Sequence, residues 1–94
     1  MARPAATIHV AYSVSRSHGR TSYWAKAAVT DEGFKGYNTV RTGIGDTALE
    51  AVDEAISYVI AAYRLDGLEP PSTTVLHGRV PRDAIVNVSF IKHQ

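Results

Sequence analysis

The sequence predicts an α+β fold with two layers, in which a three-stranded antiparallel sheet and a final strand carry one long helix packed on one face. Residues 7–42 contain three segments with the alternating pattern of strands, the segment between the Thr47 cap and the Gly67 exit has a helical pattern, and residues 84–91 alternate again. A chain of 94 residues is long enough for one domain. We therefore expect residues 1–94 to form a single β-β-β-α-β unit with a flexible start over residues 1–6.

The first half of the chain has the pattern of a hairpin followed by a third strand. In residues 7–14 apolar and polar side chains alternate, and residues 22–29 resume the alternation after a polar turn that contains Gly19. Residues 37–42 are rich in β-branched side chains, which favour strands. Trp24 and Lys26 alternate onto the opposite face of the second strand, so we expect a partly exposed aromatic there unless a partner or another copy covers it.

The predicted helix has signals at both of its ends. Thr47 followed three residues later by Glu50 is a capping box, in which the threonine oxygen accepts a free amide of the first turn and the glutamate reaches back to the cap. Gly67 supplies a left-handed exit. One apolar stripe recurs at steps of three and four residues and must be buried against the sheet: Leu49, Val52, Ala55, Ile56, Val59, Ile60 and Tyr63.

The segment after the helix is expected to return to the sheet. Pro70 and Pro71 exclude further helix and make an extended connection. Residues 73–76 have the composition of a short edge strand. In residues 84–91 apolar Val86 and Val88 alternate with polar neighbours, which predicts the last strand.

The composition limits the classes of protein to which the chain can belong. The sequence has no cysteine, which excludes disulfides and thiolate metal sites and suits a cytoplasmic protein. The N-terminus lacks an apolar signal region, and no segment approaches the ~20 apolar residues of a membrane span. A domain of this size buries a modest core, so we expect a homo-oligomer, either a dimer or a tetramer.

Charge is distributed unevenly along the chain. Residues 1–45 have a formal charge of +4 and residues 46–94 of −3, within a total of +1. The basic residues of the first half are interleaved with aromatics, a combination that can bind nucleic acid. A solvated or protein-binding face explains the same pattern, and the nearly neutral total favours that explanation.

The sequence contains no motif for catalysis, a cofactor or a metal. Gly43-x-Gly45 before a helix can present amides to an anion, but acidic groups already occupy this helix start, so a structural turn is the better explanation. The four histidines have no metal-ligand spacing. The opening strand has no carboxylate of the kind that two-metal nucleases require. We therefore expect no enzyme activity, no cofactor and no metal site.

Short motifs along the helix and after it match a known pattern. They are a helix entry, two pairs within the helix and two pairs beyond it, namely Gly45-Asp46-Thr47, Glu50-Ala51, Ala55-Ile56, Asp66-Gly67 and Pro71-Ser72. These motifs resemble those of the HicB family of antitoxins, and residues 84–88 are similar to the last strand of that family.

The resemblance implies a partial ribonuclease H-like fold without the nuclease carboxylates. It also implies a protein that assembles as a dimer or tetramer and blocks HicA, a small ribonuclease toxin with a double-stranded-RNA-binding-type fold. Two departures limit the resemblance. The family's C-terminal DNA-binding domain is not expected, because the sequence given stops after the predicted last strand. The family's Pro-Asp-Leu-Pro-Gly-type segment is replaced by residues 31–36 and the third strand.

The leading hypothesis is a non-enzymatic, oligomeric, HicB-like binding module that masks a partner protein such as a HicA-type toxin. The alternative is a stand-alone protein of phage or mobile-element origin that binds nucleic acid or a nucleotide-like ligand. A degenerate ribonuclease would be a third reading, but the sequence offers no place for its metal. The residues expected to bind the partner are basic and aromatic side chains near the basic end of the sheet: Arg16, Arg20, Trp24, Lys26, Tyr37 and Arg41.

Overall fold

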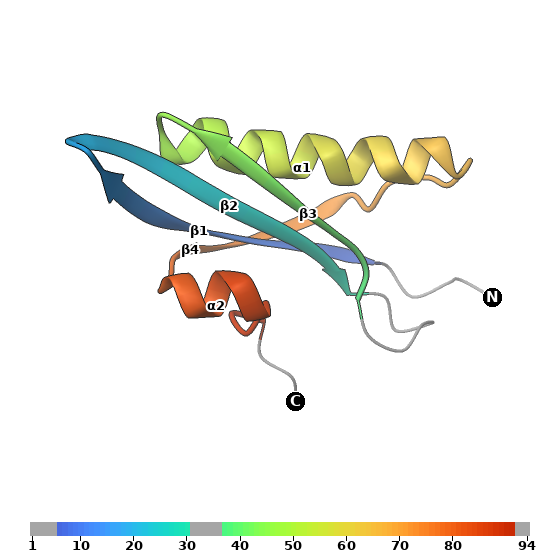
Figure 1. Cartoon of the computed structure of the whole chain (residues 1–94). Coiled ribbons are helices and arrows are strands. Elements are labelled where there is room, and N and C mark those ends of the chain that lie inside the picture. The colour runs from blue at the N-terminus through green and yellow to red at the C-terminus, as the bar shows by residue number, and fades with distance from the viewer. Residues whose placement is uncertain (1–5, 31–36, 92–94) are drawn as a thin grey trace.

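The computed structural model of the protein describes residues 6–30 and 37–91 (Figure 1). Its elements, in chain order, are β1 (Thr7–Ser17), β2 (Arg20–Thr30), β3 (Tyr37–Gly45), α1 (Ala48–Leu65), β4 (Thr73–Arg79) and α2 (Arg82–Asn87). Residues 31–36, between the second and third predicted strands, and most of the predicted flexible start lie outside the described residues.

The four strands form one mixed sheet in the order β3-β2-β1-β4. β1 pairs with β2 and β2 with β3 in antiparallel fashion, while β4 lies parallel to β1 on its other side. The α+β class and the three antiparallel strands are therefore confirmed, and the short segment predicted as an edge strand is a full strand of the sheet. Because β4 is parallel to β1, the chain between β3 and β4 must cross the sheet, and α1 makes that crossing.

α1 begins and ends where the sequence predicts. The Oγ1 atom of Thr47 accepts the amide of Glu50 at 3.1 Å, and the Glu50 carboxylate accepts the amide of Asp46, also at 3.1 Å. The helix ends at Leu65, and Gly67 has a φ of 72°, the left-handed exit that glycine favours.

Two glycines of β3 set the distance between α1 and the sheet. A Cβ on Gly43 would collide with the carbonyl oxygen of Ala51 and would lie 2.5 Å from the amide nitrogen of Ala55. A Cβ on Gly45 would lie 2.6 Å from the Cβ of Glu50. Neither glycine has a positive φ, so both are needed for space between helix and strand and not for an unusual backbone conformation.

This close approach also decides which helix face is buried. The core on this side joins alternate residues of β1 and β2 to the helix residues Ala51, Val52, Ala55 and Val59. Leu49, which the predicted stripe included, is 70% exposed, so that assignment was wrong. Small side chains face β3 because the glycines bring the helix axis near, and Leu49 is thereby turned outward.

The second correction concerns residues 84–91, which do not form a strand. α2 occupies residues 82–87, and Val88 follows it with a φ of 53°, in the left-handed region. Pro81 supplies an extended N-cap and Asp83 lies in the first turn, so the start has helix chemistry. Val86, predicted to alternate inward, is 60% exposed, whereas Ile85 is 2% exposed.

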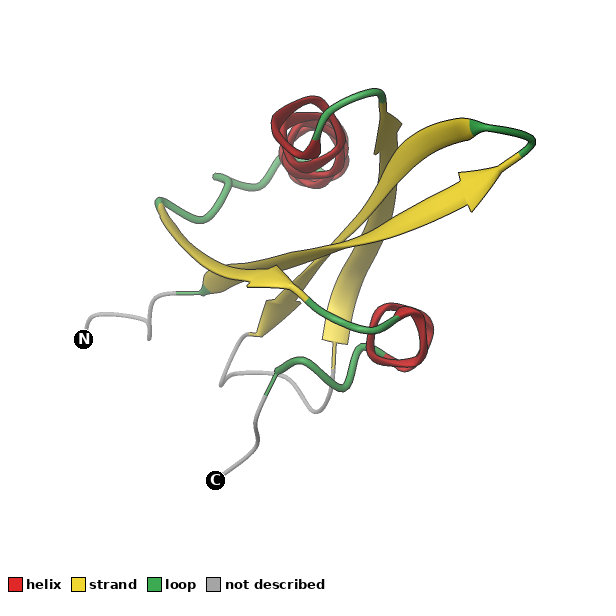
Figure 2. Ribbon diagram, turned by 90° about the vertical axis from the view of Figure 1, so that its left-hand side faces the viewer, coloured by secondary structure: helices red, strands yellow, loops and turns green. Residues whose placement is uncertain are grey.

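α2 and the residues after it cover part of the sheet face opposite α1, as Figure 2 shows. Ala11 of β1 and Ala28 of β2 form a shallow platform on which α2 and the following residues pack. The predicted two layers are therefore incomplete, because a short third layer covers this part of the second face. The buried side chains that α2 and its continuation contribute are Ile85, Val88, Phe90 and Ile91.

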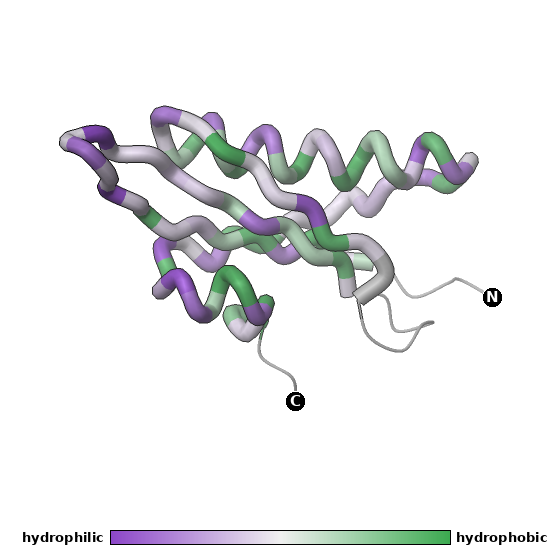
Figure 3. Tube along the Cα trace, in the orientation of Figure 1, coloured by the Kyte–Doolittle hydropathy of each residue, from purple (hydrophilic) through white to green (hydrophobic). Residues whose placement is uncertain are grey.

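The β1–β2 hairpin extends past the rest of the molecule as an arm. Its register runs to the pair Ser17 and Arg20, which leaves a two-residue turn at His18 and Gly19, with φ values of 53° and 75°. Two positive φ values in a two-residue hairpin turn are typical of a type I′ turn. Hydrophilic residues gather at this tip and at the start of α2 (Figure 3).

Candidate binding cleft at the open edge of β1

β1 is longer than the strand that pairs with its outer edge. The parallel register with β4 ends where Tyr12 meets Arg79, while the antiparallel register with β2 continues to Ser17. The last contact at that edge is a hydrogen bond of 2.9 Å from the Val80 amide to the Tyr12 carbonyl. Beyond Tyr12, the outer edge of β1 has no neighbouring strand in the described part of the chain.

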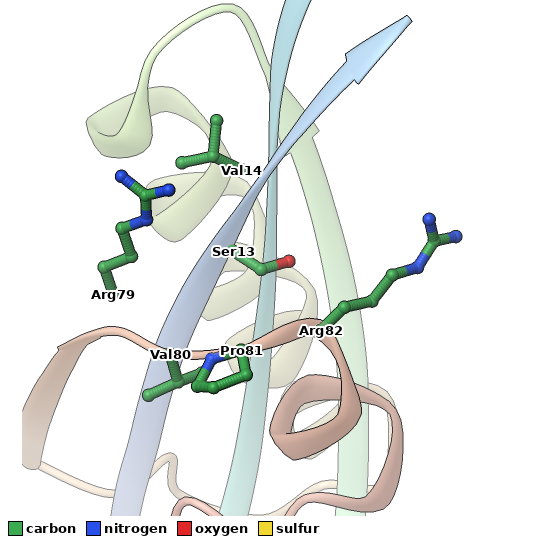
Figure 4. A pocket seen from close by; sticks show the side chains of 6 residues that line it. All are labelled: Ser13, Val14, Arg79, Val80, Pro81 and Arg82. Carbon is green, nitrogen blue, oxygen red and sulfur yellow. The ribbon is translucent and has the colours of Figure 1, made fainter.

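A cleft of about 410 Å³ lies where β4 leaves this edge. Gly78 has a φ of 80° and Pro81 has no amide hydrogen, so the chain turns away from the sheet there and crosses to α2. Figure 4 shows the result, with Arg79 and Arg82 on opposite sides of β1. The lining residues are Ser13, Val14, Arg79, Val80, Pro81 and Arg82.

The two arginines give the cleft a positive charge. Arg79 and Arg82 are both exposed, and in Figure 4 the Arg79 side chain extends alongside Val14. Arg16, two residues farther along β1, adds a third exposed cation. Among the described residues, Arg16 and Arg79 have no carboxylate partner. The described acidic residues lie within residues 46–69, apart from Asp83 on α2.

On the α2 side of the cleft, Trp24 lies close to two cationic side chains. The Arg82 guanidinium carbon lies 4.8 Å from the Trp24 ring centroid, within the range of a cation–π contact. The Lys26 ammonium donates to the carbonyl oxygen of Val86 at 3.5 Å, at the end of α2. Trp24 is therefore half-buried under Arg82 and lies next to a second cation that also steadies the short helix.

The structure brings together only some of the residues that the sequence analysis selected. Trp24 and Lys26 meet α2, and Arg20 lies on the same face at the hairpin tip, because the register alternates all three to that side. Arg16 and Arg41 alternate to the α1 side, where Arg41 is opposite Ala27 on the outer strand. The Tyr37 side chain lies outside the described residues.

Sequence reasoning missed Arg79 and Arg82. Both follow the helix, in the half of the chain with net negative charge, so a count by halves assigned them to the acidic end. The signal that could have found them is the break between Gly78 and Pro81, which marks the end of a strand flanked by two cations.

A pair of histidines, His9 on β1 and His77 on β4, connects these two strands. The Nδ1 atom of His9 is 2.8 Å from the Nε2 atom of His77, so one ring donates a hydrogen bond to the other. The His77 ring also packs at 5.5 Å from the ring of Phe90. Burial, and next the neighbouring His77, lower the pKa of His9 below its usual value of 6.5. The pair therefore favours the neutral form of His9.

Two carboxylates of α1 are used at the start of the helix. Glu50 accepts the Asp46 amide, and Glu54 accepts the Ile44 amide at 3.2 Å. In the described residues no group of three or more histidine, aspartate or glutamate side chains could hold a metal ion. The Gly43-x-Gly45 segment faces α1, so its glycines are explained by helix packing.

No family model matches the chain, and neither a curated protein nor a solved structure matches it. The resemblance to HicB antitoxins therefore rests on the sequence motifs alone. Neither helix in the described part of the chain is long and apolar enough to cross a membrane.

Proposed function

We propose that this chain is a non-enzymatic, oligomeric binding module that masks a partner protein, in the manner of the HicB antitoxins that it resembles. The observation that carries the proposal is the cleft beside β1. It offers an open strand edge, two exposed arginines and a nearby tryptophan on one compact scaffold. Surfaces in which arginine and aromatic residues surround a concave site are typical of protein interfaces.

The helix entry supports the family assignment. The Gly45-Asp46-Thr47 motif has a physical role here, since Gly45 admits the helix and Thr47 caps it. A mixed sheet with one long helix across one face is compatible with the partial ribonuclease H-like fold that the resemblance implies. A HicA-type ribonuclease toxin is therefore the first partner to test.

Co-expression tests the proposal directly. A HicA-type toxin encoded beside this gene, or one from a panel of such toxins, is expressed with and without the chain, and growth is recorded. We expect the chain to restore growth and to co-purify with the toxin. The variant Arg79→Glu, Arg82→Glu should lose both effects, whereas Arg64→Glu at the end of α1 should keep them. Toxins that are neither bound nor silenced would contradict the proposal.

A second candidate function is binding of nucleic acid, which the position of Trp24 beside Arg82 and Lys26 favours, with Arg20 farther along the same face. Bases stack on aromatic rings while cations hold the phosphates. Fluorescence anisotropy with labelled single-stranded RNA and DNA over a range of salt concentrations distinguishes this function. Affinity that falls steeply with salt and requires Trp24 would support it. No binding at low salt would exclude it.

A further inference from the structure

The backbone of β1 has hydrogen-bonding groups that point out of the sheet beside the cleft. The Tyr12 carbonyl points toward the β4 side, because it accepts the Val80 amide. Backbone groups two residues apart in a strand point the same way. The amides and carbonyls of Val14 and Arg16 therefore point to the open edge, whereas those of Ser13 and Ser15 point to β2.

Such an edge is a template for another strand. Exposed strand edges pair readily with extended segments, and several recognition domains bind peptides by adding them to a sheet. Here β4 leaves the sheet at Arg79, so an added strand would continue its line along β1. Val14 and Arg16 can supply two donors and two acceptors to it.

The charges around the edge select the occupant. Arg16 and Arg79 alternate to the α1 side of the sheet, and Arg82 lies over Trp24 on the α2 side, so that Arg79 and Arg82 are on opposite sides of β1 in Figure 4. An incoming strand would thus have cations near both rows of its side chains. An antiparallel second copy of β1 would bring Arg16 and Arg79 of two chains together, and such like-charge contacts are unfavourable.

From this geometry we infer that the open edge of β1, over residues 13–17, captures an extended acidic segment of the partner as an added strand. The inference rests on the proposed binding function and specifies its chemistry. Backbone hydrogen bonds to Val14 and Arg16 hold the segment, and carboxylates on the segment pair with Arg79 and Arg82. The Arg79 side chain, which now extends along Val14, turns to meet such a carboxylate.

A labelled heptapeptide of sequence Glu-Glu-Val-Glu-Glu-Val-Glu, which places glutamates in both rows of side chains, is the probe, and its affinity for the full chain is measured by anisotropy. The matched control is the same peptide with N-methyl groups on alternate residues, which keeps the charge and removes the hydrogen bonds of one edge. We expect the methylated peptide to bind at least about tenfold more weakly. Equal affinity of the two peptides would overturn strand addition.

Variants of the chain locate the site. Val14→Pro removes the outward amide without removing a hydrogen bond to β2, and Arg79→Ala removes a cation. Both variants should lower the affinity for the unmethylated peptide about tenfold, whereas Arg64→Ala on α1 should leave that affinity unchanged. Should Val14→Pro fail to fold, amide chemical shifts of Val14 and Arg16 in the wild-type chain decide the site, and shifts confined to other residues would overturn it.

Three further outcomes separate the alternatives. If the chain self-associates and Val14→Pro abolishes that self-association, the occupant of the open edge is a second copy of the chain and not an acidic segment. If single-stranded RNA displaces the peptide and binds more tightly, the occupant is nucleic acid. A toxin that the wild type and Val14→Pro silence equally would leave the proposed masking function intact and overturn strand addition alone.

Discussion

The two faces of the sheet are covered by helices of different kinds. On one face α1 has 18 residues and lies so close to β3 that Gly43 touches its backbone. On the other face α2 has six residues and rests on the side chains of Ile85 and its neighbours. The difference teaches that close backbone packing fixes a long helix in one position, whereas a short helix held by bulky side chains covers only part of a face and leaves a cleft beside it.

The charged groups at the β3–α1 junction also differ from those at the open edge of β1. The carboxylates of α1 bind backbone amides at the β3–α1 junction, where they stabilise the fold. The arginines around the crossing from β4 to α2 are exposed and available to a ligand. The carboxylates at the β3–α1 junction thus maintain structure, whereas the arginines at the open edge of β1 are exposed on both faces of the sheet.

The largest effect is expected from Gly43→Ala. The new Cβ would collide with the Ala51 carbonyl, so α1 must shift, at a cost of about 3 kcal/mol in the free energy of unfolding. Urea denaturation measures the change. The control is Gly19→Ala, where nothing lies within 4 Å and only the positive φ is unfavourable, at about 1 kcal/mol. Equal losses at the two sites would show that α1 does not lie against β3 as described.

The partly covered face is tested by Ile85→Ala, which should cost about 2.5 kcal/mol, because the side chain is almost fully buried. Val86→Ala is the matched control and should change the free energy of unfolding by less than about 0.5 kcal/mol, since Val86 projects into solvent. A strand over these residues would reverse the order of the two losses, so the pair also tests the helix assignment.

A smaller effect is expected at the start of α1. Thr47→Ala removes the oxygen that accepts the Glu50 amide and should cost about 1 kcal/mol. Thr47→Ser keeps that oxygen and should lie close to the wild type. Thermal unfolding followed by circular dichroism measures both variants, and a Thr47→Ser protein as unstable as Thr47→Ala would argue against the cap.

The smallest effect is expected from the protonation of His9, whose side chain lies on the α2 side of the sheet. Because the folded chain lowers the pKa of His9, the unfolded chain binds a proton more readily, and stability is lost as the pH falls below about 6.5. Above that value the contribution is complete. Urea denaturation between pH 8 and pH 5 should show the loss in the wild type and a reduced loss in His9→Gln.

Much of the fold could be predicted from local signals. The strands β1, β2 and β3 alternate clearly, and the caps of α1 are encoded by Thr47, Glu50 and Gly67. The outward position of Leu49 could not be predicted, because it depends on how closely β3 lets the helix approach. The α2 segment contains both an alternating pattern and apolar residues three apart, and the platform of Ala11 and Ala28 decides between them.

The candidate site was less predictable than the fold. Trp24 and Lys26 were selected from their alternation on β2, and the structure places them beside Arg82. Arg79 and Arg82 reach the site only because β4 runs parallel to β1 and stops short of its end. That stopping point depends on strand pairing between distant segments, which the local sequence does not specify.

The length of the hairpin arm has a consequence for local motion. Past Tyr23, where β3 ends, the two strands of the hairpin pair with each other and with no third strand of the described chain. Two-stranded ribbons are marginally stable in water, so the facing amides of Ser15 and Ser22 should exchange their hydrogens with solvent without unfolding of the core. A bound third strand would slow that exchange, and the tip of the arm would then report by itself whether the edge is occupied.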